Sequence, residues 1–172
     1  MTRSGSTADC SNAKNVPVGA VIAKRAVIEA VFDKMDRAVV HSSTFGQNVL
    51  AMTAGLATLH AIDTESIVER AATTGSALLA DLQSVAERHE VVHEVRGRGL
   101  MIGIELVQDR ATKEPLSHEK IGELMGYVLS HGVMMVPCGR YGNVMRVMPS
   151  LTIPRSLLFK ALDIFGRGLS TL

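Results

Sequence analysis

The 172-residue sequence contains no tryptophan, and aromatic residues make up only 3% of it. Proteins that bind nucleic acid combine basic surfaces with aromatic side chains on which the bases stack. This sequence has a formal net charge of only +1, with acidic and basic residues interspersed. We therefore expect no nucleic-acid partner.

Long hydrophobic runs and cysteines are also scarce. No apolar run approaches the roughly 18 residues that a membrane-spanning helix needs, so no membrane partner is expected. Residues 1–15 lack the apolar stretch of a secretory signal. The two cysteines, Cys10 and Cys138, form neither a C-x-x-C motif nor a disulfide framework, which indicates inert thiols in a reducing cytoplasm. The six histidines are scattered, and no metal site is predicted.

The first third of the chain changes character twice. Residues 1–15 are polar and small, and we expect them to be disordered or unrelated to the rest of the chain. Residues 16–22 are nearly all apolar and predict a short buried strand. Residues 24–36 carry an amphipathic helical pattern. The helix expected over 47–62 is apolar on most sides, which predicts burial between layers.

The rest of the chain predicts helices packed on one face of a small sheet, an α+β arrangement. Ser66 and Glu69 have the spacing of a capping box at a helix start. We expect the last helix to bury Leu157, Leu158, Ala161, Leu162 and Phe165. The expected elements are, in order, a helix over 66–89, extended chain over 91–108 with a strand at 100–107, a helix capped by Ser117 and ending near 131, strands at 133–136 and 144–148 around a turn, and a helix opened by Pro154.

Two places in the sequence suggest chemistry and leave two interpretations open. Residues 41–48 (HSSTFGQN) put hydroxyl side chains directly before a helix, where they either cap it or help hold a phosphate. Arg146 interrupts the apolar run 144–149, where it either pairs with a carboxylate or lies on the solvent face of an alternating strand. The glycines at 97, 99 and 103 indicate turns, and the methionines at 134, 135, 145 and 148 indicate core packing.

Four collinear stretches resemble the class III pyridoxal-phosphate aminotransferases. They are residues 17–21 (PVGAV), 41–48 (HSSTFGQN), 95–105 (VRGRGLMIGIE) and 143–151 (NVMRVMPSL). The resemblance implies an α/β chain, part of the pyridoxal-phosphate-dependent transferase fold type I. Residues 16–64 would be the end of the large cofactor domain, and 65–172 the small C-terminal α+β domain.

The resemblance also implies roles for three residues. Thr44, with Ser43 beside it, would bind the phosphate of pyridoxal 5'-phosphate held by the partner subunit of a homodimer. Arg146 would hold the substrate carboxylate. The substrates would be an amino donor and a 2-oxo acid, and which ones is left open.

One family feature is missing from the sequence. The family's Schiff-base lysine precedes Pro-Val-Gly in a Ser-Lys stretch, whereas Asp9 and Cys10 stand near that position and Lys14 is only three residues before Pro17. No catalytic residue is therefore assigned. We expect a C-terminal part of such an enzyme that works with an upstream fragment or, alternatively, a non-catalytic dimerisation remnant.

Overall fold

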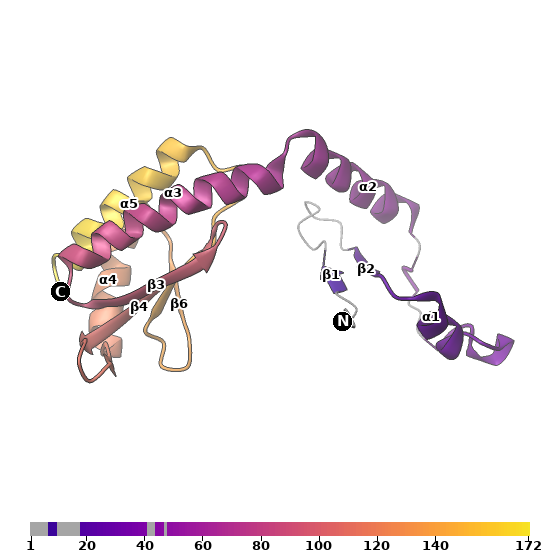
Figure 1. Cartoon of the computed structure of the whole chain (residues 1–172), viewed down its shortest axis with the longest axis horizontal. Coiled ribbons are helices and arrows are strands. Elements are labelled where there is room, and N and C mark those ends of the chain that lie inside the picture. The colour runs from indigo at the N-terminus through magenta and orange to yellow at the C-terminus, as the bar shows by residue number, and fades with distance from the viewer. Residues whose placement is uncertain (1–6, 10–17, 41–43, 47) are drawn as a thin grey trace. The chain divides into compact units, whose positions relative to one another are not determined.

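The computed structural model describes residues 7–9, 18–40, 44–46 and 48–172, and the chain forms two compact units. Unit 1 is Met1–Glu65 and unit 2 is Ser66–Leu172 (Figure 1). None of the helices in the described ranges is long and apolar enough to cross a membrane.

Unit 1 holds short elements and one longer helix. Strands β1 (Thr7–Asp9) and β2 (Gly19–Val21) pair in antiparallel fashion. The residues of β1 are therefore in a strand, where disorder was expected. The helix expected over 24–36 ends early, as α1 (Arg25–Val31), and a 3-10 turn comes next at Met35–Arg37. The longer helix is α2 (Val49–Thr64).

The predicted burial of the helix over 47–62 is wrong for this chain. Ala51 is the sole buried residue among the described residues of unit 1. Leu56 is 69% exposed and Leu50 is 68% exposed. The physical reason is that no second layer among the described residues of unit 1 covers the helix, so its apolar sides stay open.

Unit 2 consists of helices packed against one antiparallel sheet, as expected. The sheet order is β3-β4-β7-β6, and β5 pairs with β4. Helix α3 runs along the β3–β4 hairpin (Figure 1). The elements are α3 (Ile67–Arg88), β3 (Val92–Arg98), β4 (Met101–Asp109), β5 (Glu114–Pro115), α4 (His118–Ser130), β6 (Val136–Cys138), β7 (Val144–Val147) and α5 (Arg155–Leu169).

The core of unit 2 lies between the helices and one face of the sheet. Leu78 and Leu82 of α3, Leu124 of α4 and Phe165 of α5 are almost completely buried there. Helix α5 corrects one expectation, because Leu157 is 56% exposed. It is the neighbour of buried Leu158 and so points about 100° away around the helix. The other buried positions of α5 are Leu162, Ile164, Gly168 and Leu169.

Of the three glycines interpreted as turn residues, Gly99 lies in the turn of the β3–β4 hairpin, which confirms the interpretation for that residue. It is wrong for Gly97, which is in β3, and for Gly103, which is in β4. Gly99 has a φ of 57° between β3 and β4, in the left-handed region that favours glycine. The turn packs closely against α3. A Cβ atom added at Gly75 would lie 2.2 Å from the carbonyl oxygen of Gly99. Gly75 is therefore required by this contact, and Gly99 is favoured by its backbone conformation.

The C-terminus of α4 explains why the next strand begins late. Gly132 has a φ of 81°, and the Val133 N–H donates to the Val128 carbonyl at 2.9 Å. The Gly132 N–H donates to the Leu129 carbonyl at 2.9 Å, which completes a Schellman motif. Val133 is thereby tied to the helix, and the strand expected at 133–136 forms instead at Val136–Cys138.

The two ends of α3 are held differently from the prediction. Ser66 is in the left-handed region, with a φ of 49°, and its side chain makes no capping hydrogen bond, so the predicted capping box is wrong. At the other end, the Arg110 guanidinium donates to the carbonyls of His89 (3.0 Å), Glu90 (3.0 Å) and Val92 (2.9 Å). Arg110 therefore ties the end of α3 to the start of β3.

Candidate functional site

Thr44 lies in an exposed turn, Thr44–Gly46, shortly before α2. Ser43 lies outside the described residues. The start of α2 is capped by Asn48, whose side-chain oxygen accepts hydrogen bonds from the N–H groups of Leu50 (3.0 Å) and Ala51 (3.2 Å). Sequence reasoning missed this cap, although Asn directly before an apolar helical run is a recognisable signal.

The capping by Asn48 bears on how a phosphate could bind here. The helix donors that commonly hold an anion are the N–H groups of the first turn, and two of them are already satisfied. Among the described residues before α2, the exposed Thr44 hydroxyl is a further donor. The described residues alone therefore do not form a complete cradle for pyridoxal phosphate.

Arg146 is on β7, in register with Gly103 of β4 and Val136 of β6. It is exposed, whereas the preceding Met145 is completely buried. Among the ion pairs of the described residues, none involves Arg146. The structure thus gives Arg146 the outward position of an alternating strand, available to a ligand.

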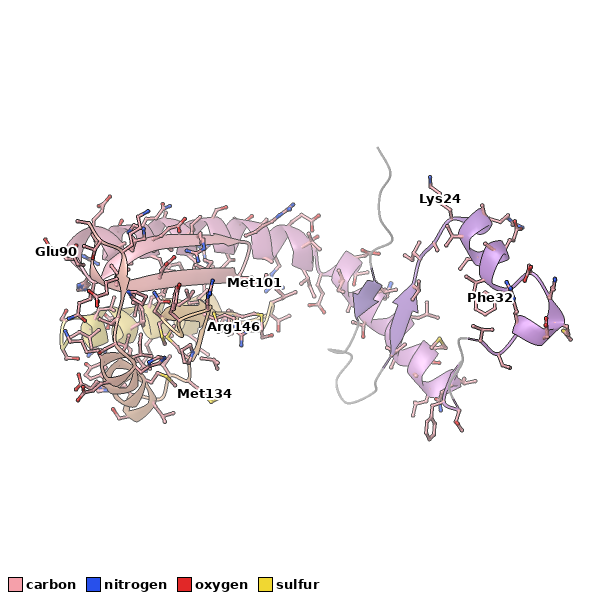
Figure 2. The ribbon with its side chains drawn as sticks, turned by 90° about the horizontal axis from the view of Figure 1, so that it is seen from below. Lys24, Phe32, Glu90, Met101, Met134 and Arg146 are labelled. Atoms are coloured by element: carbon pink, nitrogen blue, oxygen red, sulfur yellow. The ribbon has the colours of Figure 1, made fainter. Side chains whose placement is uncertain are left out.

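A cleft of about 640 Å³ adjoins Arg146. Figure 2 labels Arg146 and Met134, both of which line it. The expectation that the methionines pack in the core is corrected in part: Met145 is buried, but Met134 and Met148, which line the cleft, are 84% and 60% exposed. Other lining residues come from 131–136, 146–149, Ile153 and α5, and those of α5 include Leu157, Leu158 and Phe165. The cleft thus combines largely apolar walls with two cationic side chains, Arg146 and Lys160.

A second arginine on the sheet has carboxylate partners. Nη1 of Arg96 donates to Glu94 Oε2 and to Glu105 Oε2, each at 2.7 Å. The hydrogen bond with Glu105 raises the pKa of Arg96 above its ordinary value, and the charge of Glu94 adds to this effect. Sequence reasoning missed this cluster, because the strand register that brings residue 96 beside residue 105 depends on the hairpin at Gly99.

Residues 89–93 (HEVVH) match the H-E-x-x-H zinc motif. The prediction of no metal site did not take this match into account. The motif needs both histidines on one helix face. Here α3 ends at Arg88, His89 is extended with a φ of −130°, and β3 begins at Val92. Within the described ranges, no three His, Cys, Asp or Glu side chains are placed to hold a metal. The helical geometry of that motif is therefore not formed.

A family model described as aminotransferase class-III matches residues 11–169. The chain is 41% identical over 124 residues to alanine–glyoxylate aminotransferase 2 homolog 2 of Arabidopsis thaliana, covering 70% of this chain and 26% of that protein. It is 36% identical over 154 residues to isoleucine 2-epimerase of Lentilactobacillus buchneri, covering 90% and 32%.

Solved structures show the same relationship. A Bacillus anthracis aminotransferase matches with a TM-score of 0.83 and 30% identity, over 91% of this chain and 36% of that one. The chain thus spans between about a quarter and just over a third of the length of these relatives. Because one relative is named an epimerase, family membership leaves the reaction open among more than one type.

Proposed function

The chain belongs to the class-III aminotransferases, and from this premise we propose that it serves amino-group transfer between an amine or amino acid and a 2-oxo acid. Pyridoxal 5'-phosphate supplies the chemistry in this family, by forming a covalent link to the amine. The observation that carries the proposal is the exposed Arg146 beside an apolar cleft, in a chain whose residues 11–169 match the family.

We assign to Arg146 the binding of the substrate carboxylate. A guanidinium forms two parallel hydrogen bonds with a carboxylate, and an exposed, outward-facing arginine can do so without breaking an existing ion pair. The apolar cleft walls would contact the substrate's carbon chain. Thr44, with Ser43, would donate to the cofactor phosphate of a partner subunit in a cytoplasmic homodimer.

The remaining groups would come from outside the described residues. We propose that residues 16–64 are the end of a large cofactor domain and that 65–172 are the small domain. The Schiff-base lysine would then be supplied by an upstream fragment of the same enzyme. The split of the chain into two compact units, Met1–Glu65 and Ser66–Leu172, supports this division.

The test combines the purified chain with the complementary part of a class-III relative, pyridoxal phosphate, an amino donor and a 2-oxo acid. We expect visible absorbance of lysine-bound cofactor and formation of the new amino acid in the mixture. Arg146→Ala should raise KM for the 2-oxo acid by about tenfold or more, because a charged hydrogen bond is lost. Arg140→Ala, an exposed arginine, is the matched control. Transfer that is unaffected by Arg146→Ala would contradict its role.

The phosphate role of Thr44 has a separate test in the same mixture. Thr44→Ala should weaken cofactor binding by about tenfold, measured by absorbance titration. The control is Thr53→Ala, because the Thr53 hydroxyl donates to the Val49 carbonyl (2.8 Å) within α2. Equal affinity of both variants would remove Thr44 from the site.

A second candidate function is a non-catalytic dimerisation module. The observation that favours it is the open apolar surface of α2, where Leu50, Leu56 and Leu59 are 68%, 69% and 51% exposed. This function predicts a dimer by light scattering, with no cofactor absorbance in any mixture. A monomer would exclude it.

A further inference from the structure

The strand register places four side-chain positions of the sheet in one row. Arg96 of β3 lies opposite Gly103 of β4, which lies opposite Arg146 of β7, which lies opposite Val136 of β6. Directly paired residues project from the same face of a sheet. The alternate positions Ile102, Ile104 and Met145 are buried in the core, so the row lies on the opposite face.

The next row along this face supplies the carboxylates. Glu94 lies opposite Glu105, which lies opposite Val144. Glu105 is therefore a diagonal neighbour of both Arg96 and Arg146, one on each side of its strand. Diagonal neighbours are about 7–8 Å apart at the backbone, which long side chains can span. Gly103 has no side chain, but a Cβ atom added there would lie 3.1 Å from Cγ1 of Val144, so Glu105 would reach Arg146 past the Val144 side chain.

Of these two arginines, the structure pairs Glu105 with Arg96. The contact is 2.7 Å, and the Glu105 side chain is 28% exposed, against 52% for Glu94. Glu105 is thus the more enclosed of the two carboxylates. If it turned instead toward Arg146, it would occupy the guanidinium that a ligand carboxylate needs.

We propose that Arg96 is a positioning residue that holds the Glu105 carboxylate away from Arg146 and so keeps Arg146 open to a ligand carboxylate. The inference rests on the proposed role of Arg146 in substrate binding. It predicts a competition: without Arg96, Glu105 pairs with Arg146. Glu94, which is one strand further away, does not.

The test measures how fast each arginine of the intact chain reacts with phenylglyoxal, with the modified peptides quantified by mass spectrometry. A guanidinium paired with a carboxylate reacts more slowly than an open one. In Arg96→Met we expect modification of Arg146 to slow about two- to fivefold, the size of effect that an exposed ion pair provides. Arg140 is the internal reference, and its rate should not change.

Two double variants separate the two carboxylates. Arg96→Met/Glu105→Gln should restore the wild-type rate at Arg146, whereas Arg96→Met/Glu94→Gln should remain slow. The proposal is overturned if Arg96→Met leaves the Arg146 rate unchanged, or if both double variants restore it equally. Should Arg96→Met fail to fold by circular dichroism, Arg96→Gln replaces it with the same expected pattern.

This assay needs neither cofactor nor substrate. A failure of the proposed aminotransferase function would therefore leave the reactivity pattern intact. Conversely, an unchanged Arg146 rate in Arg96→Met would remove the positioning role while leaving the family function standing.

Discussion

Units 1 and 2 contain similar apolar residues, but unit 2 buries them and unit 1 leaves them exposed. In unit 2, α3, α4 and α5 bury Leu82, Leu124 and Phe165 against a sheet. In unit 1, Leu56 and Phe45 are 69% and 81% exposed. The difference teaches that an apolar helix gains its burial from a second layer, and within the described ranges it is in unit 2 that helices pack on a sheet.

The largest expected effect tests this comparison at single side chains. Phe165→Ala should lower the free energy of unfolding by about 3–5 kcal/mol, because it leaves a cavity in the core of unit 2. Leu56→Ala should change it by less than about 0.5 kcal/mol, because the side chain is already exposed. Urea denaturation followed by circular dichroism measures both. A comparable cost for the two variants would break the comparison.

The contact between α3 and the hairpin gives the next effect. Gly75→Ala should destabilise unit 2 by about 1–3 kcal/mol, because the new methyl group would overlap the Gly99 carbonyl. Gly122→Ala in α4 is the matched control, because a Cβ atom there meets nothing within 4 Å. It should stabilise the protein by about 0.5–1 kcal/mol through helix propensity. Thermal unfolding of the two variants should therefore shift in opposite directions.

An arginine in each unit sharpens the comparison further. Arg110→Ala should cost about 1–2 kcal/mol, because it removes several hydrogen bonds to carbonyl groups at the end of α3. Arg25→Ala in unit 1 should cost less than about 0.5 kcal/mol, because Arg25 only forms an exposed pair with Glu29 at 3.6 Å. Urea denaturation of the two variants measures the difference. Equal losses would show that Arg110 holds no more than a surface ion pair does.

The smallest effect concerns pH. Burial lowers the pKa of His89 below its ordinary value of 6.5, and the charges of Arg88 and Arg110 act in the same direction. The neutral form is therefore favoured in the folded state, so this stabilisation is present above pH 6.5 and is lost as the pH falls toward the lower folded pKa. His89→Gln should reduce the loss of stability between pH 7 and pH 5. An identical pH profile in the variant would contradict this assignment.

Sequence patterns predicted burial best where the apolar stripe of a helix packs on a sheet within the same unit. The helix expected over 66–89 forms as α3, and its stripe of apolar residues is buried: Ile67, Ala71, Leu78, Leu82 and Val85. The turn at Gly99 was also predicted from its residues. The predictions failed where a neighbouring element determines burial or the start of a strand. Helix α2 lacks a covering layer among the described residues of its unit. Val133 is hydrogen-bonded to the end of α4 and therefore does not begin the next strand.

The candidate site divides in the same way. Arg146 could be identified from the sequence alone, because a charged residue within an apolar run is recognisable without knowledge of the fold. The pairing of Arg96 with Glu105 could not, because it depends on which residues face each other across two strands. Asn48 carries a recognisable capping signal, but the hydroxyl residues before it carry a competing one.

The close approach of Gly75 on α3 to Gly99 in the hairpin turn links helix packing on the buried face of the sheet to the positions of side chains on its exposed face. The hairpin turn at Gly99 fixes the register of β3 against β4, and this register places Arg96 opposite Gly103. A bulkier residue on α3 would have to push this turn outward and so disturb the alignment of both strands. Substitutions on a helix behind the sheet could thereby retune the charge pattern in front of it without altering any charged residue.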